Sequence, residues 1–477
     1  MMGAIVLSHR WLGIAFCFLF AMWFASGIVM HFVPFPSLTE AERFAGLAPV
    51  ERAQPVMSVA DAVAASGIAD ATRVRLIQRS DGPVYVVSGP SRVRAAHASD
   101  GADASVEFPD VALAIAQDHA RRRGLDAANA TIAARADYDQ WSVPNGFDRH
   151  RPLFRVALGD AAGTEIYVSS PTGEVVLDTI RSERGWNWVG SVVHWIYPTV
   201  LRSNWPLWDQ VVSTLSLVAL TAAVLGAVLG VIRIRIRGRQ IASPYRGWHA
   251  LHHIIGLVST VFVLTWIFSG WLSMDHGRLF SRGQLTPAEA AVTNAVPDWR
   301  AAPSLDQQPI SSPVREIEWF AFQGSVFRRD RTGLNSQTLT RAGEPAPARQ
   351  AAFLTEQDFL SLTTRLATGC GAASVVAYKD DYPAQSIVPG APVYRARCGD
   401  LWFDIDGADG SVLQRLDASR RAYRWLYGAL HTLDFPVLMA HPRLRDVLIV
   451  GLCALGLVFS VTGIVLGWSR LRSTFVT

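Results

Sequence analysis

The sequence predicts a membrane protein of mixed class, in which transmembrane α-helices alternate with soluble α+β domains and this unit occurs twice. Three observations support this fold class. Of the 477 residues 50% are hydrophobic and the mean hydropathy is +0.20, which is too apolar for an ordinary soluble protein. Four apolar runs are long enough to cross a bilayer, and many residues recur at constant offsets. We therefore expect two tandem helix–domain–helix repeats related by a pseudo-two-fold axis.

The apolar runs define four expected transmembrane helices. They lie near residues 5–35, 211–232, 254–274 and 448–468, and each reaches the roughly 20 residues that span a hydrocarbon core. The first run is too long for a signal-peptide core and lacks a clear cleavage site, so it is kept as a helix. The expected division is transmembrane helices at 1–35, 207–232, 248–276 and 443–470, soluble domains at 36–206 and 277–442, a loop at 233–247 and a tail at 471–477.

Arginine placement predicts the orientation of the chain. Arginines of the loop and of the C-terminal region are Arg233, Arg235, Arg237, Arg239, Arg246, Arg470 and Arg472. Because positive charge marks the cytoplasmic side of membrane proteins, we expect both termini in the cytoplasm and both soluble domains in the periplasm, with the chain in a bacterial inner membrane. The overall charge is nearly balanced, with 44 Lys and Arg against 40 Asp and Glu, so nucleic-acid binding is not expected.

The duplication is inferred from matched residues. His9-Arg-Trp-Leu-Gly13 matches His252-His-Ile-Ile-Gly256 at an offset of 243 residues. A longer block with a constant offset of 237 carries Gly173, His194, Asp209, Gly226 and Gly230 onto Gly410, His431, Asp446, Gly463 and Gly467. A constant offset through a hairpin, a histidine and a helix is hard to obtain by chance. The repeat therefore pairs histidines of one copy with histidines of the other.

Each soluble segment has the pattern of an α+β domain. Residues 58–66, 111–123 and 356–367 have helical periodicity, whereas 84–87 and 155–158 favour strands. Two hairpins are expected to turn at Gly173 and Gly410. The stretch 324–350, rich in Arg, Thr, Gly and Pro, is expected to be irregular. Cys370 and Cys398 lie in a polar segment, and we predict that they form a disulfide in an oxidising compartment.

One segment is more specific than the rest, namely Tyr423-Arg-Trp-Leu-Tyr-Gly-Ala-Leu-His-Thr-Leu-Asp-Phe-Pro436. With the opening at His9 and the hairpin after Tyr167, it resembles the PepSY-associated transmembrane family over essentially the whole chain. The resemblance implies two PepSY-like domains, at 36–206 and 277–442. Members of the family include inner-membrane haem proteins that look like ferrisiderophore reductases. The first copy departs from the pattern, since Trp186 and Asn187 stand where the second has Tyr423 and Arg424. We expect no fused flavin domain of the kind that some relatives carry.

The matched histidines are the candidate haem ligands. Ionisable groups at membrane depth are costly and are usually functional, and two neutral imidazoles on facing helices can bind one haem iron from both sides. We expect His9 and His252 to hold one haem b near the cytoplasmic surface, and His194 and His431 to hold a second near the other surface. For both pairs the alternative role is that of a polar anchor at the membrane border.

Other residues are candidates for supporting roles. His31, His276 and His249 are alternative ligands. His9 and His31 are 22 residues apart on one expected helix, a rise of about 33 Å, which suits haem sites near both surfaces. Arg10 and Arg246 are possible partners of haem propionates, although anchoring at the cytoplasmic border is the more common role of arginines at such positions.

The expected function is that of a membrane cytochrome b that moves electrons outward and reduces a ferric siderophore, or another ferric chelate, in the periplasm. Hard oxygen ligands favour Fe(III), so reduction to Fe(II) loosens the chelate and frees the metal. The expected donor is a quinol or a separate cytoplasmic reductant. The alternatives are a PepSY-type binding or regulatory protein without redox activity, and a transporter of iron or siderophore, since duplicated membrane halves often enclose a transport site.

Overall fold

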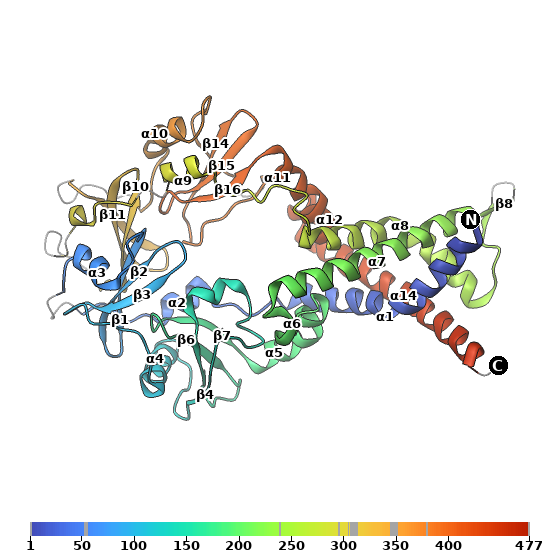
Figure 1. Cartoon of the computed structure of the whole chain (residues 1–477), viewed down its shortest axis with the longest axis horizontal. Helices are drawn as coiled ribbons and strands as arrows, with labels where there is room; N and C mark the ends of the chain where they lie inside the picture. The colour runs from blue at the N-terminus through green and yellow to red at the C-terminus, as the bar shows by residue number, and fades with distance from the viewer. Residues whose placement is uncertain are drawn as a thin grey trace. The chain divides into compact units, whose positions relative to one another are not determined.

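The computed structural model describes residues 2–51, 56–237, 240–293, 296–303, 305, 313–343, 352–377 and 380–475. The chain forms two compact units (Figure 1). The membrane unit comprises Met1–Phe35, Glu183–Arg282 and Ser419–Thr477, and the soluble unit comprises Pro36–Ser182 and Gly283–Ala418. Both units therefore collect segments that are far apart in the sequence.

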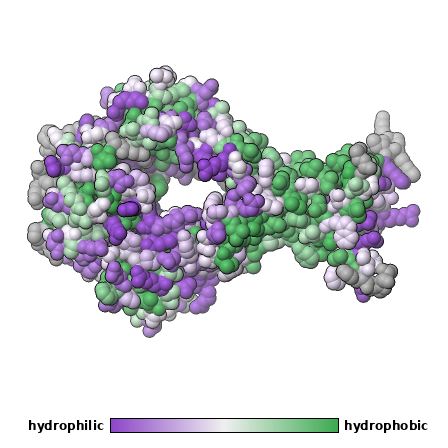
Figure 2. Space-filling view, viewed as in Figure 1, coloured by the Kyte–Doolittle hydropathy of each residue, from purple (hydrophilic) through white to green (hydrophobic). Residues whose placement is uncertain are grey.

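Four long apolar helices build the membrane unit. They are α1 (Met2–Phe32), α7 (Trp205–Ile232), α8 (Gly247–Met274) and α14 (Pro442–Phe475). All four are long and apolar enough to cross a bilayer, which confirms the prediction of four spans in a membrane protein. Figure 2 shows the apolar surface of this unit. Phe24, Val263, Trp266 and Ile449 are buried in its core.

The helices pack in a regular pattern. α1 lies mainly against α14 and α7 mainly against α8, while further contacts join α1 to α7 and α8 to α14. The first residues of α1, the last turns of α14, and the hairpin of β8 (Arg235–Arg237) and β9 (Gln240–Ala242) lie at one end of the bundle, which we name the terminal end (Figure 1). Arg239 lies outside the described residues. The other end carries the short helices that precede α7 and α14.

Short helices lead into α7 and α14. They are α5 (Arg181–Asn187), η2 (Trp188–Val192) and α6 (Thr199–Arg202) before α7, and α11 (Ala418–Tyr423), η4 (Arg424–Ala429), α12 (Leu430–Thr432) and α13 (Pro436–Met439) before α14. Ile196 and Leu433 have φ values of 51° and 52°, a region that is strained for residues other than glycine. Each of them stands two residues after a candidate histidine, His194 or His431, so both histidines lie directly before a sharp bend.

The largest sheet of the soluble unit is antiparallel and runs in the order β12-β11-β10-β1-β2-β3. Its strands are β1 (Arg73–Arg79), β2 (Gly82–Ser88), β3 (Val93–His97), β10 (Glu316–Phe322), β11 (Ser325–Gly333) and β12 (Ser336–Arg341). β1 pairs with β10, with Leu76 opposite Ile317, so both soluble segments contribute to one sheet. The expectation of an irregular stretch at 324–350 is wrong for β11 and β12, and residues 344–350 lie outside the described residues.

Two four-stranded sheets complete the unit. One runs β4 (Thr131–Ala136), β5 (Leu153–Ala157), β6 (Glu165–Ser169), β7 (Val175–Thr179), and the other β13 (Ser374–Val375), β14 (Val393–Cys398), β15 (Leu401–Asp406), β16 (Val412–Leu416). The first packs on α4 (Pro109–Arg122) and the second on α10 (Glu356–Leu366). The remaining short elements are α2 (Glu40–Ala45), α3 (Val59–Ser66), η1 (Asn145–His150), α9 (Pro287–Thr293) and η3 (Trp299–Ala301).

Two local predictions for the soluble unit are confirmed. The hairpins β6–β7 and β15–β16 turn at Gly173 and Gly410, with φ values of 65° and 79°, which glycine adopts without strain. The disulfide between Cys370 and Cys398 is present. It attaches the chain after α10 to the end of β14.

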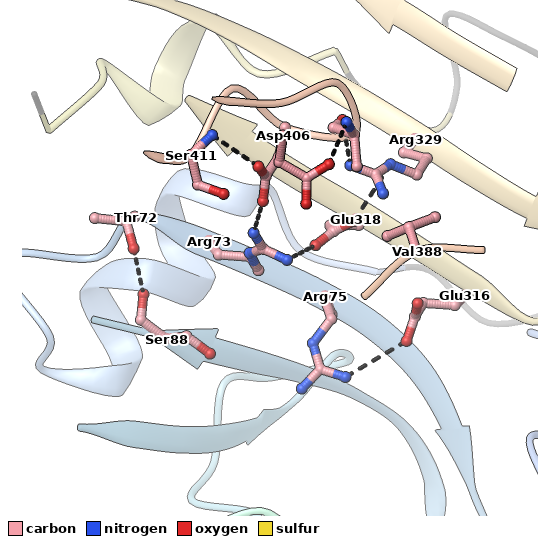
Figure 3. Close-up of polar contacts among 12 residues, drawn as sticks. Thr72, Arg73, Arg75, Ser88, Glu316, Glu318, Arg329, Val388, Asp406 and Ser411 are labelled. Carbon is pink, nitrogen blue, oxygen red and sulfur yellow. Dashed lines mark hydrogen bonds and ion pairs between the residues drawn. The ribbon is translucent and has the colours of Figure 1, made fainter. Parts of the chain in front are cut away.

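Charged side chains of β1, β10 and β11 gather on part of one face of the six-stranded sheet, where Figure 3 shows Arg73, Arg75, Glu316, Glu318 and Arg329. Glu316 of β10 accepts hydrogen bonds from Arg43 at 2.7 Å and from Arg331 of β11 at 2.9 Å. Burial alone would raise the pKa of Glu316, but Arg43, Arg75 and Arg331 outweigh it and hold this pKa well below its ordinary value. The carboxylate is therefore ionised inside the unit.

The same network reaches both hairpins of the four-stranded sheets. Arg75 of β1 pairs with Glu174, next to the first turn, at 2.6 Å. Arg73, also of β1, pairs with Glu318 at 2.7 Å and with Asp409, next to the second turn. Because an unpaired buried charge is strongly unfavourable, these ion pairs stabilise the contact of both hairpins with β1.

Candidate functional site

A cavity of about 640 Å³ lies in the membrane unit toward its terminal end. All four long helices contribute to its wall, which is mostly apolar and includes Gly13, Gly226, Gly256 and Gly463. Its volume falls in the range of small-molecule and cofactor sites, about 300–1,000 Å³. The structure places His9 and His252 together on the wall of this cavity.

Hydrogen bonds fix the tautomer of this first pair. His9 Nδ1 lies 3.2 Å from the carbonyl oxygen of Ala222, and a carbonyl only accepts, so Nδ1 carries the proton. His252 Nδ1 lies 2.8 Å from the hydroxyl of Thr462, whose own proton is donated to the Phe459 carbonyl at 2.6 Å. The hydroxyl must then accept from His252 Nδ1. In each neutral imidazole the lone pair is left on Nε2, the nitrogen available to a metal.

The second pair, His194 and His431, lies near the other end of the bundle and has the same arrangement. His194 Nδ1 is 3.0 Å from Ser26 Oγ, and His431 Nδ1 is 3.1 Å from Ser269 Oγ. Each hydroxyl donates to a carbonyl of its own helix, at 2.6 and 3.1 Å, and therefore accepts from the imidazole. All four histidines thus have the proton on Nδ1 and the lone pair on Nε2.

The separation of the second pair fits a shared metal. The ring centroids of His194 and His431 are 6.3 Å apart. An imidazole nitrogen binds a metal at about 2.0–2.1 Å, so two rings on opposite sides of one ion have centroids roughly 6 Å apart. Burial lowers the pKa of His194 to about 3, with a further contribution from His431, and burial lowers the pKa of His431 to about 4. Both imidazoles are therefore neutral, as metal binding requires.

Glycines leave room beside each histidine. A Cβ atom added at Gly226 would lie 2.7 Å from the His9 ring, so a larger residue would force a shift. At Gly27, Gly270 and Gly463 the added Cβ would lie 3.7, 3.4 and 3.6 Å from the nearest histidine ring. The lack of a side chain at Gly226 thus allows the His9 ring to approach α7 closely, whereas a Cβ at the other three positions would be in ordinary van der Waals contact with the imidazoles.

The described residues that line the cavity include the arginines Arg10, Arg233 and Arg470. Their guanidinium groups suit carboxylates such as those of a haem. Arg10 was expected from the sequence, whereas Arg233 and Arg470 were missed as site residues. The sequence held a signal for them, because Arg233 and Arg470 match at the offset of 237 from which the duplication was inferred. Arg246 is instead the N-cap residue of α8 and is not among the described residues that line the cavity.

The alternative ligands have other surroundings. His31 Nε2 lies 2.9 Å from Asp446 on α14, and His276 Nδ1 lies 2.5 Å from Asp209 on α7. These histidine–carboxylate pairs tie α1 to α14 and the end of α8 to α7. His249 lines the cavity. The structure thus gives His31 and His276 carboxylate partners, while His249 stays a candidate ligand on the cavity wall.

His253 also lines the cavity, but its hydrogen bonds differ from those of the four candidate ligands. His253 Nε2 lies 2.9 Å from the Gly230 carbonyl oxygen, and its Nδ1 lies 2.9 Å from the Ser243 hydroxyl. Nε2 must donate to the carbonyl, so both ring nitrogens are engaged. His253 therefore connects the chain after β9 to α7 and α8, and its lone pair is not available for a metal.

Comparison with known proteins places the whole chain in one family. No curated protein matches the chain. The sequence model of the PepSY-associated TM region matches residues 6–470, a range that contains the four long helices almost completely, both soluble segments and all four histidines described above. The chain therefore belongs to the family of the PepSY-associated TM region.

Proposed function

We propose that this protein is a haem b oxidoreductase of the bacterial inner membrane, which passes electrons outward and reduces a ferric siderophore or a similar ferric chelate. One observation carries the proposal: four histidines in two pairs share one tautomer, with Nδ1 hydrogen-bonded and Nε2 left as the metal-binding nitrogen. Haem iron with two axial histidines transfers single electrons, and its potential is set by the ligands and their surroundings.

The proposal includes a duplicated architecture. One copy would run from α1 through the first soluble segment to α7, and the second from α8 through the second segment to α14, with a pseudo-two-fold axis between them. Two histidine–carboxylate contacts between the copies support the duplication. His31 of the first copy pairs with Asp446 of the second. His276 of the second copy pairs with Asp209 of the first. Each haem would then take one axial histidine from each copy.

The strongest support for the first haem site is the cavity itself. His9 and His252 would bind the iron, and Arg10, Arg233 and Arg470 would hold the propionates at the terminal end. With the positive charge at that end in the cytoplasm, the donor would be a quinol or a cytoplasmic reductant. Electrons would leave through the second pair to the periplasmic side, where reduction of Fe(III) to Fe(II) weakens its hold on hard oxygen ligands.

The absorption spectrum of the purified full-length protein tests this function. We expect bound haem whose bands sharpen and shift when dithionite is added, and whose reduced form is reoxidised by a ferric siderophore. His9→Ala or His252→Ala should remove one haem per chain, whereas His253→Ala, which alters the same cavity wall, should leave the haem content unchanged. A colourless protein that fails to take up added haemin would refute the proposal and favour a PepSY-type binding or regulatory role, or transport.

A further inference from the structure

An aromatic ring stacks on one histidine of each pair. Phe459 of α14 lies against His252, with ring centroids 4.8 Å apart and planes inclined by 18°. Tyr427 of η4 lies against His431, with centroids 5.7 Å apart and planes inclined by 30°. Both distances are those of stacked aromatic rings. The two histidines that carry a ring belong to the same proposed copy, the second.

The corresponding positions of the first copy hold the smallest side chains. At the offset of 237, Phe459 corresponds to Ala222 and Tyr427 corresponds to Gly190. Ala222 meets His9 through its carbonyl group. Gly190 packs against α1, where an added Cβ would lie 3.0 Å from Val29. Neither position of the first copy therefore carries an aromatic side chain. Ala222 contacts His9 through its backbone, and the backbone of Gly190 packs against α1.

The surroundings of His252 and His9 also differ at the glycine that follows each histidine by one turn. A Cβ added at Gly256, one turn after His252, would lie 2.9 Å from the Phe459 ring, so this glycine makes room for the ring. Its sequence match is Gly13, one turn after His9, where an added Cβ would meet nothing within 4 Å. Gly13 faces the open cavity. The space beside Gly256 is thus filled by the Phe459 ring, whereas no side chain lies within 4 Å of a Cβ added at Gly13.

We propose that Phe459 and Tyr427 are positioning residues that fix the ring planes of His252 and His431, so that the two axial histidines of each haem are inequivalent. The inference rests on the proposed haem function. The torsion that turns an imidazole about its Cβ–Cγ bond has broad minima, and one hydrogen bond at Nδ1 restrains it only partly. A ring stacked on the face of the imidazole adds the second restraint, and within the described part of the chain no such ring stacks on His9 or His194.

Electron paramagnetic resonance of the oxidised full-length protein tests the inference, because the low-spin signal of ferric haem depends on the angle between its two imidazole planes. We expect Phe459→Leu to move the signal of the haem held by His9 and His252, and Tyr427→Leu to move the other signal. Release of the affected haem should become roughly 2- to 10-fold faster, the range expected for the loss of one ring stack.

Two control variants separate positioning from a general packing effect. Tyr427→Phe keeps the stacked ring and should keep the wild-type signal. Phe262→Leu removes a ring from the core of the same helix bundle that is not among the described residues lining the cavity, and it should also leave the signals in place. A colourless wild-type protein would refute the haem function itself. Haem-containing Phe459→Leu and Tyr427→Leu variants with wild-type signals would overturn the positioning role alone, as would an equal shift in the controls.

Discussion

The hydrogen bond from His252 to Thr462 leads to a quantitative prediction. Thr462→Val keeps the β-branched shape of the side chain but removes the oxygen that accepts the Nδ1 proton at 2.8 Å. The substitution also removes the hydrogen bond that the Thr462 hydroxyl donates to the Phe459 carbonyl within the same helix. The variant therefore leaves His252 Nδ1 without its acceptor in a mostly apolar cavity.

The size of the effect follows from the cost of an unpaired buried donor. That cost is about 1–3 kcal/mol, and loss of a partner that orients a metal-binding histidine weakens metal sites about 10- to 100-fold. We expect haem to leave the Thr462→Val protein roughly 10- to 100-fold faster than the wild type, measured by transfer of haem to an excess of apomyoglobin. The reduction potential should shift as well, because the hydrogen bond tunes the ligand.

Thr260→Val is the matched control for this prediction. Thr260 lines the same cavity, but its hydroxyl donates to the Gly256 carbonyl in its own helix at 2.7 Å. The control should therefore release haem at the wild-type rate. Equal rates for Thr462→Val and Thr260→Val would contradict the assignment of the proton to His252 Nδ1.

Three further predictions concern other parts of the molecule. Arg233→Gln should speed haem release about 2- to 5-fold, as expected for one exposed ion pair, while Arg246→Gln, which removes the same charge outside the cavity, should not. Glu316→Gln should lower the free energy of unfolding by about 3–5 kcal/mol at neutral pH. Because its folded pKa is depressed, that loss should shrink in urea titrations as the pH falls below the ordinary value of 4.5. Cys370→Ser should cost about 2–4 kcal/mol, and a reductant should abolish the difference from the wild type.

The parts of the fold that the sequence predicted well are those encoded by local patterns. Apolar runs long enough to span a bilayer indicated the four long helices, and the turns at Gly173 and Gly410 follow from residues that favour tight turns. For the candidate site, matched offsets singled out the four histidines without any structural information. The tautomers could not be predicted, because they depend on acceptors such as Thr462 that lie on another helix.

The parts that the sequence did not predict depend on contacts between distant segments. The pairing of β1 with β10 joins two soluble segments that the sequence presents as separate, and no local pattern specifies such a partner. β11 was missed because Arg329 and Arg331 are buried in it, whereas strand prediction expects apolar residues on a buried face. Glu318 and Glu316 on the neighbouring strand supply opposite charges that offset this burial.

The shared six-stranded sheet has a consequence for biogenesis. In the sequence, both α7 and α8 lie between β1 and its partner β10. During synthesis the first three strands therefore emerge with one edge unpaired, and that edge must wait until two membrane helices and the start of the second soluble segment have been made. At about 5–20 residues per second this interval lasts many seconds, and an open strand edge is prone to pair with other chains. Arg73 and Arg75 of β1, which form ion pairs in the finished unit, place charge on the strand at that edge, and charged side chains make pairing with other chains less favourable.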